Sequence, residues 1–192
     1  MVPIWNYLLA SAGRVGINGA IRLTDLKPWP DAAEIWATLY ESWVPPGFTL
    51  IDLQPDHIDY IRFRDMDERT YGAIQNFRSF TKQFQGPGWT FTFEDNVLAV
   101  FGFFPMWDGV AEGWMIGDIQ LPDYGRIFLR GARQFMDWIG PRSHLHRIQF
   151  TVHAPNVHAY RFAKTLYFSS EGVLHKYAPD QTDFFMMARN YP

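Results

Sequence analysis

Residues 145–189 constrain the fold of this chain more than any other segment, because they predict strand, helix and hairpin in unbroken succession. RIQFTVH (147–153) predicts a strand, and Asn156 is placed to cap the helix that follows. That helix is predicted to bury Ala159, Phe162, Ala163 and Leu166, which recur at helical spacing. SEGVLHKY and DFFMMAR, separated by the turn APDQT, then predict two paired strands.

The middle of the chain predicts further strands and helices. Strands are expected at 48–53, 89–94, 97–104 and 110–117, and helices at 55–63, 65–84 and 122–139. Asp65 and Glu68 form a capping box for the second of these helices, and Gly140-Pro141 is expected to stop the third. Turns are expected at Asp95-Asn96 and Asp108-Gly109. The fold class is therefore α/β, a mixed sheet of about six or seven strands with helices on both faces.

Residues 1–46 are expected to form an N-terminal extension with one helix, followed by one domain over residues 47–192. Asp31 is placed to cap the helix, with Glu34 three residues on. Its apolar stripe comprises Ile35, Trp36, Leu39, Tyr40 and Trp43, and PPG at 45–47 ends it. Because large exposed rings in one patch are unfavourable, we expect the stripe to pack on the rest of the chain or on another chain.

Composition argues against several classes of protein. No apolar run approaches the roughly 20 residues that span a bilayer, so no membrane span is expected. A net charge of −3 argues against a dedicated nucleic-acid binder. The chain has no cysteine, which excludes disulfides and thiolate chemistry. Aromatic residues make up 18% of the chain; we expect a core built on rings, with an aromatic-lined groove or an interaction surface as the alternative.

The order of elements over residues 48–189 resembles that of the GNAT acyltransferase superfamily. NVHAYRFAKTLYFSSEG (156–172) resembles the family's N-x-x-A…L-G-F-x-x-E-G stretch, and AEGWMIG (111–117) resembles its central strand. A narrower resemblance, carried by IDYIRFRDMDERTYGAI and FGFFPMWDGVAEGWMIGD, is to GNAT-like proteins of short-tailed bacteriophages, some labelled internal virion proteins. That resemblance implies a location in the cytoplasm of a bacterial host or within the virion. It also implies virion or host proteins as partners, and a homo-oligomer is left open.

The GNAT resemblance implies acyl transfer from acetyl-CoA to an amine. The pantetheine would lie in a gap between two diverging strands, and the pyrophosphate at the start of the next helix. Glu112 is the candidate general base, with an ordinary hairpin carboxylate as the alternative. Tyr167 is the candidate acid, or a residue packed into the sheet. The candidate cofactor-binding residues are Gly117, Gln120, Gly125, Arg126, Arg130 and Asn156.

The sequence departs from the family pattern in two places. The family's pyrophosphate loop has Arg or Gln, two residues, Gly, one residue, then Gly or Ala; this chain has Gln120 but Pro122-Asp123 where the first Gly should come. Asp123 would repel a phosphate. Arg126 and Arg130 could supply charge, or they form a solvated basic face. The family's usual Tyr acid is replaced by Ala163.

Two functions of different class therefore stay open. The first is a non-catalytic phage-type GNAT-fold protein that binds virion or host proteins, and the departures favour it. The second is an acetyl-CoA-dependent N-acyltransferase acting on a protein or a small amine, which Glu112 favours. No metal site is expected, since no cysteine or well-spaced carboxylate completes the pair His144 and His146.

Overall fold

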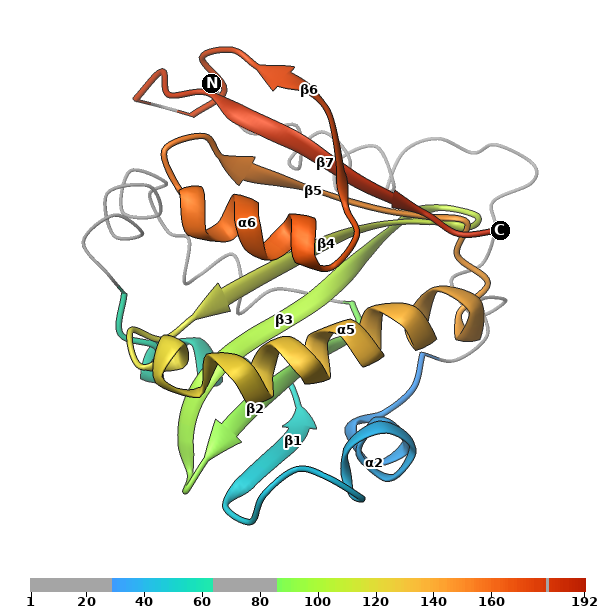
Figure 1. Ribbon diagram of the computed structural model, residues 1–192, viewed down its shortest axis with the longest axis vertical. Coiled ribbons are helices and arrows are strands. Elements are labelled where there is room, and N and C mark those ends of the chain that lie inside the picture. Colours follow the sequence, from blue (N-terminus) through green and yellow to red (C-terminus); the bar gives the residue numbers. More distant parts are fainter. Residues whose placement is uncertain (1–28, 64–85, 179) are drawn as a thin grey trace.

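The computed structural model describes residues 29–63, 86–178 and 180–192, which form one mixed sheet with helices on both faces (Figure 1). Its seven strands lie in the order β1-β2-β3-β4-β5-β7-β6. The strands are β1 (Phe48–Asp52), β2 (Gly88–Phe93), β3 (Asn96–Trp107), β4 (Val110–Gly117), β5 (Arg147–His153), β6 (Ser169–Leu174) and β7 (Phe184–Asn190). All neighbours are antiparallel except β4 and β5. The predicted fold class is confirmed.

Helices pack on both sides of this sheet. The helical segments are α2 (Ala32–Ile35), the π-helical η2 (Trp36–Tyr40), the 3-10 helices η3 (His57–Tyr60) and η4 (Leu121–Tyr124), α5 (Gly125–Arg142) and α6 (Val157–Thr165). Helices α5 and α6 lie on one face (Figure 1), where Phe128 stacks on Phe162 with ring centroids 5.7 Å apart. Segment η3 lies on the other face, because Ile58 packs with Val100 and Ile116. Within the described residues, no helix has the length and hydropathy needed to cross a membrane.

Strand β3 is buried on both faces, as its apolar run predicts. Ala99 and Phe103 belong to the large core cluster beneath α5, whereas Val100 belongs to the small cluster around η3. Successive side chains of a strand point to opposite faces, so one continuous apolar run supplies both cores.

The segment from Trp29 to Tyr40 packs against the sheet and α5. Asp31 accepts a hydrogen bond from the N–H of Glu34 at 2.7 Å, which confirms the predicted cap. Ile35 is completely buried in the large core, and Trp29 stacks on Phe103 at 5.4 Å. The carboxylate of Glu34 binds Arg142, near the end of α5. The apolar stripe is therefore covered by the same chain; the boundary at residue 46 stays a prediction.

Several predicted boundaries are wrong. The helix expected at 55–63 is only the 3-10 segment η3, and α5 begins at Gly125, after the 3-10 segment η4, rather than near Pro122. Helix α5 does not stop at Gly140-Pro141 but runs to Arg142. A proline in the last turn forfeits only its own N–H bond, and the N–H of Ser143 still bonds the carbonyl of Ile139 at 2.9 Å. The turn between β2 and β3 is centred on Glu94-Asp95 rather than Asp95-Asn96, because Asn96 already pairs with Phe93. The helix predicted at 65–84, with its capping box, lies outside the described residues.

Candidate functional site

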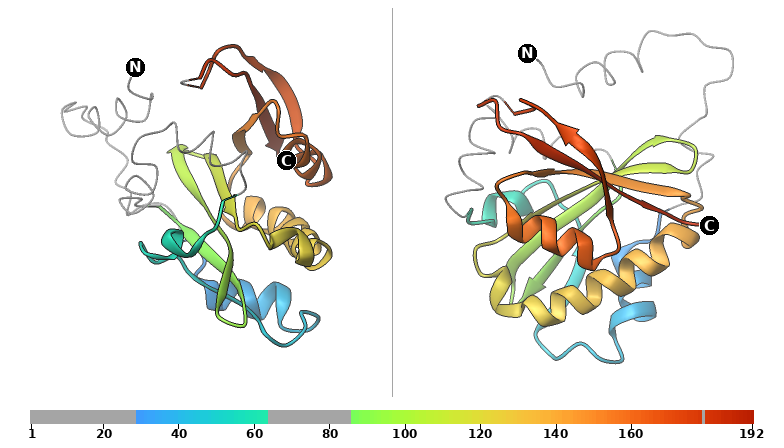
Figure 2. Two further views of the ribbon diagram at one scale, coloured as in Figure 1. Left: turned by 90° about the vertical axis from the view of Figure 1, so that its left-hand side faces the viewer. Right: turned by 45° about the horizontal axis from the view of Figure 1, so that its top comes forward.

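Strands β4 and β5 pair over only part of their length. Their parallel register joins Val110 to Arg147, Ala111 to Ile148 and Glu112 to Gln149, and ends there. Beyond Glu112 the strands separate, so that β5, β7 and β6 lean away from β2–β4 (Figure 2). The crossover through the helix predicted at 122–139 requires the strands at 110–117 and 147–153 to be parallel, and the GNAT resemblance implies that two strands diverge toward Gly117 and His153. Both expectations are confirmed. The divergence leaves the backbone edges of both strands facing a gap.

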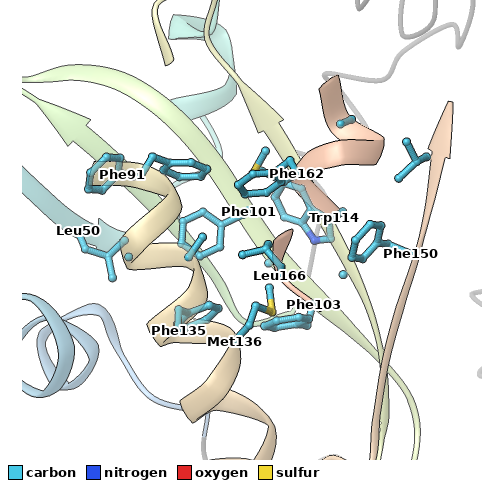
Figure 3. A pocket seen from close by; sticks show the side chains of 18 of the residues that line it. Leu50, Phe91, Phe101, Phe103, Trp114, Phe135, Met136, Phe150, Phe162 and Leu166 are labelled. Carbon is cyan, nitrogen blue, oxygen red and sulfur yellow. The ribbon is translucent and has the colours of Figure 1, made fainter. Parts of the chain in front are cut away.

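An apolar cavity of about 200 Å³ extends from this gap beneath α5 and α6 (Figure 3). Gly113, Trp114 and Met115 of β4 line one side, and residues 150–153 of β5 line the other. The remaining wall is largely aromatic. It includes Phe91, Phe101, Phe103, Phe128, Phe135 and Phe162. The aromatic composition therefore supplies both a core of rings and an aromatic-lined cavity within it.

Glu112 lies at the point where the two strands part. Ala111 is buried in the core cluster of α5, so the neighbouring Glu112 side chain points to the opposite face of the sheet. Burial raises the pKa of the Glu112 carboxyl to about 7, against a hydrogen bond from Gln149 that lowers it. A carboxyl group that is half ionised near neutral pH is suited to accept a proton. Glu112 thus combines a raised pKa with a position beside the gap, and its role as the general base stays a prediction.

A chain of polar contacts connects Glu112 to the edge strand β6. Arg147 donates from Nε to Oε1 of Gln149 at 2.8 Å and pairs through both terminal nitrogens with Glu171. Since Oε1 of Gln149 accepts from Arg147, the amide nitrogen of Gln149 is the atom that donates to Glu112. The network holds Gln149 in one orientation.

Tyr177 is a site residue that the sequence did not reveal. It follows β6, contacts the cavity residue Phe184 with tilted rings whose centroids are 5.2 Å apart, and is 44% exposed. Burial and the nearby charge of Glu112 raise the pKa of Tyr177. Phe184 also contacts the His153 ring at 5.1 Å. Tyr177, Phe184 and His153 therefore form a cluster of rings, and Tyr177 is near enough to Glu112 for its charge to act on the hydroxyl.

The connection from β4 to α5 is organised by Asp118, which is 2% exposed. Its carboxylate accepts from the N–H of Gln120 at 2.9 Å. It also accepts from the N–H, Nε and Nη2 of Arg62, at 2.8, 3.1 and 2.8 Å. Sequence reasoning missed this pair, because 56 residues separate the partners.

The backbone N–H groups of this connection bond within the protein. Those of Ile119, Leu121, Asp123 and Gly125 bond, respectively, to the carbonyls of Arg62, Asp118, Gln120 and Pro122. A pyrophosphate cradle needs such groups directed at the ligand. The amides therefore do not fit a pyrophosphate, and the exposed Asp123 adds a like charge. The 18-residue helix α5 still presents its N-terminus and the exposed Arg126 at this end.

The predicted cofactor-binding residues fall into separate groups. Gly117, Gln120, Gly125 and Arg126 all lie at the β4–α5 connection. A Cβ on Gly117 would come within 2.7 Å of the Leu121 side chain, whereas one on Gly125 would meet nothing within 4 Å. Gly117 thus permits close packing, and Gly125 leaves open space.

Arg130 and Asn156 lie farther along. The Arg130 guanidinium sits 4.0 Å above the Trp43 ring, toward the N-terminal segment. Asn156 lines the cavity and accepts from the N–H of Ala159 at 3.0 Å, so it caps α6 as its sequence position predicts.

Tyr167 does not line the cavity. It is 58% exposed, and its hydroxyl accepts from Arg133. Arg133 and Arg189 also lie over its ring, at 4.9 and 5.6 Å. The residue has a φ of +64°, a left-handed conformation that explains why the resembling stretch has glycine at this position. The structure therefore does not bring Tyr167 and Glu112 to one site.

The histidine pair is exposed at the start of β5. His144 and His146 both lie at the surface. Within the described parts of the chain, no group of three or more His, Asp or Glu side chains is placed to hold a metal.

Comparisons with known proteins place this architecture. No family model and no curated protein matches the sequence. Among solved structures, a GNAT-family acetyltransferase from Bacillus anthracis superposes with a TM-score of 0.60 at 14% identity, covering 75% of this chain and 95% of that one. The ribosomal-protein-S5-alanine acetyltransferase of Vibrio fischeri superposes with a TM-score of 0.54 at 12% identity, covering 77% and 95%.

A third neighbour was solved with a ligand. The protein yncA of Salmonella typhimurium, with its cofactor acetyl-CoA, superposes with a TM-score of 0.53 at 12% identity, covering 75% of this chain and 94% of that one. At these identities the likeness concerns the fold. Together with the strand order and the diverging β4 and β5, it shows that this chain has the fold of the GNAT acetyltransferases.

Proposed function

We propose that this protein is an N-acyltransferase that moves an acyl group from a pantetheine thioester, such as acetyl-CoA, to an amine on a protein or small molecule. The observation that carries the proposal is the position of Glu112. A carboxyl group with a pKa of about 7 stands where β4 and β5 part, and the next residue, Gly113, lines the cavity.

The donor and the amine would bind on opposite faces of the sheet. The gap between β4 and β5 offers backbone edges to the amides of pantetheine, and the cavity receives the apolar part of the donor. Glu112, Gln149 and Tyr177 lie on the opposite face, where an amine would approach. Because the cavity passes between the strands, amine and thioester would meet in the gap.

The reaction balances with the residues present. The amine nitrogen forms a bond to the acyl carbon, and the carbon–sulfur bond breaks. Glu112, with Gln149 orienting its carboxylate, accepts the proton that the amine loses. That proton returns, directly or through solvent, to the departing thiolate, so the products are an amide and a thiol.

The solved neighbours support this choice of donor and acceptor. One neighbour is described with acetyl-CoA as its cofactor, and another is an acetyltransferase acting on an alanine of ribosomal protein S5. The β4–α5 connection argues against tight binding of the nucleotide part of the donor, because its backbone N–H groups bond to carbonyls within the protein. We therefore expect the thioester to be held mainly by its pantetheine and acyl parts, with Arg126 and the α5 N-terminus contributing the contact to phosphate.

A non-catalytic binding protein, of the virion-associated or host-interacting kind that the bacteriophage resemblance implies, is the second candidate. The specific observation in its favour is the same loop, in which Asp118 and the neighbouring carbonyls engage the amides that a pyrophosphate would need. In that case the GNAT fold would serve as a scaffold, since a fold does not carry a reaction by itself.

Thiol release in the presence of amines separates the two candidates. The chain has no cysteine, so a thiol-reactive dye reports only the thiol set free from acetyl-CoA or another acyl-CoA. The acyltransferase proposal predicts release above the protein-free rate with a panel of small amines and N-terminal peptides, and its loss in Glu112→Gln. Lys164→Gln, exposed on α6, serves as the control. Absence of release with every thioester and amine, together with no heat of binding, would favour the binding protein.

A further inference from the structure

The cavity is larger than an acetyl group requires. Its volume is about 200 Å³. A cavity of about 150 Å³ lined by aliphatic and aromatic side chains holds a benzene molecule. The gap lined by β4 and β5 is part of this volume and would take the end of the pantetheine arm. An acetyl group in the gap would leave the part beneath α5 empty, and unfilled apolar space forfeits packing contacts.

The cavity is also deeper than the gap between β4 and β5. It continues beneath α5 as far as Leu50 of β1 and Phe91 of β2 (Figure 3). The lining between the gap and this end is apolar and includes Phe101, Phe135 and Met136. The inner end is thus an apolar chamber beneath α5, where Phe91 contacts Phe128 of the first helical turn with ring centroids 5.7 Å apart.

The polar lining groups gather at the opening. Thr151, His153 and Asn156 lie beside the gap, on β5 and before α6. Two polar groups at the inner end are occupied by backbone: the Tyr40 hydroxyl donates to the carbonyl of Gly131 at 3.3 Å, and the Trp43 indole N–H donates to that of Leu39 at 2.6 Å. A ligand at the inner end would therefore contact mainly the faces and edges of aromatic rings. A thioester at the gap with an apolar tail beneath α5 would match this gradient.

We infer that the preferred acyl group is an unbranched alkyl or aryl group of about six to eight carbons, by comparison with the benzene-sized cavity. The inference rests on the proposed acyl transfer and names its donor class. It also explains how a thioester could bind although the backbone N–H groups of the β4–α5 connection bond internally. Burial of the acyl tail would supply affinity that contacts to the pyrophosphate do not. Each buried methylene contributes about fourfold in affinity.

The test is calorimetric titration of the full chain with acetyl-, butanoyl-, hexanoyl-, octanoyl-, dodecanoyl- and benzoyl-CoA. Affinity should rise by about fourfold per methylene and level off near six to eight carbons, where the cavity is full. Equal affinity for acetyl- and hexanoyl-CoA would overturn the inference but leave the proposed function standing. No binding of any thioester would count against both. A rise that continues to dodecanoyl-CoA would show unspecific apolar association and would also overturn it.

Two reciprocal variants place the tail. Ala132→Leu fills the chamber from α5, and should weaken octanoyl-CoA binding by about tenfold or more while leaving acetyl-CoA within about twofold. Met136→Ala enlarges the chamber and should move the optimum to a longer chain, which keeps the inference testable if the filled variant does not fold. Lys164→Leu, exposed on α6, is the matched control and should leave the chain-length profile unchanged. An unchanged profile in a folded Ala132→Leu or Met136→Ala protein would contradict the inference.

Discussion

The carboxyl group of Glu112 is the ionisable group whose surroundings matter most to this account. Its pKa of about 7 results from partial burial, which disfavours the charged form, and the bond from Gln149 offsets only part of this. A group whose folded-state pKa is raised in this way destabilises the protein once it is ionised. The cost is absent below the unfolded pKa, near 4.5, and grows as pH rises toward 7.

Replacing Glu112 with glutamine should therefore stabilise the protein at neutral and alkaline pH. The difference in unfolding free energy should be small near pH 4 and should grow to about 1–3 kcal/mol by pH 8, since one pKa unit corresponds to about 1.4 kcal/mol. Urea denaturation of both proteins between pH 4 and pH 8 measures it. A difference that does not change with pH would contradict the raised pKa.

Asp118 holds the β4–α5 connection in the shape described. Asp118→Asn removes a carboxylate oxygen that accepts from Arg62, and leaves a buried amide facing donors. We expect a loss of about 1–3 kcal/mol in unfolding free energy. Asp123→Asn, exposed in the same connection, is the control and should change stability by less than about 0.5 kcal/mol. Equal effects of the two variants would show that the Arg62 pair does not order the loop.

At the scale of elements, the N-terminal segment is tied into the core by Ile35, which is fully buried. Ile35→Ala should cost about 2–4 kcal/mol, because the lost side chain leaves a cavity between α2 and the sheet. Thr38→Ala, at an exposed position of η2, should have little effect. Deleting residues 1–46 should lower the melting temperature further than Ile35→Ala does. A truncated protein that melts at the same temperature would show instead that the segment is an independent appendage.

The succession of strands and helices could be predicted because local patterns carry it. Asn156 caps α6, and the apolar run of β3 is buried on both sides. The parallel pairing of β4 with β5 could be predicted from the crossover through α5, whereas their early divergence was implied only by the GNAT resemblance. The extra residues of α5 could not, since its end depends on a single proline-containing turn.

The candidate site was predicted only in part, because its members come from distant elements. Glu112 could be found from its place at the start of a central strand. Tyr177 reaches it only through the pairing of β6 with β7, and Arg62 reaches Asp118 across 56 residues. Tyr167 shows the converse: its place in a matched stretch suggested the site, but its left-handed turn directs it toward Arg133. Patterns local in sequence do not encode such long-range contacts.

At the scale of the whole molecule, the sheet separates two faces and is open where β4 and β5 diverge. The cavity beneath α5 and α6 lies on one side, and Glu112, Gln149 and Tyr177 lie on the other. The opening exists because β4 and β5 share only three paired positions. An acyl donor and an amine could thus approach from opposite faces and meet beside one carboxylate of suitable pKa.

The pH dependence of thiol release from an acyl-CoA, in the presence of an accepted amine, tests this arrangement most directly. We expect a rate that rises with pH through an apparent pKa of about 7, as Glu112 ionises. Glu112→Gln should lower the rate by about 100-fold or more and remove that inflection, while binding of the thioester stays nearly intact. A Glu112→Gln protein that keeps both the rate and the inflection of the unmodified protein would contradict the account.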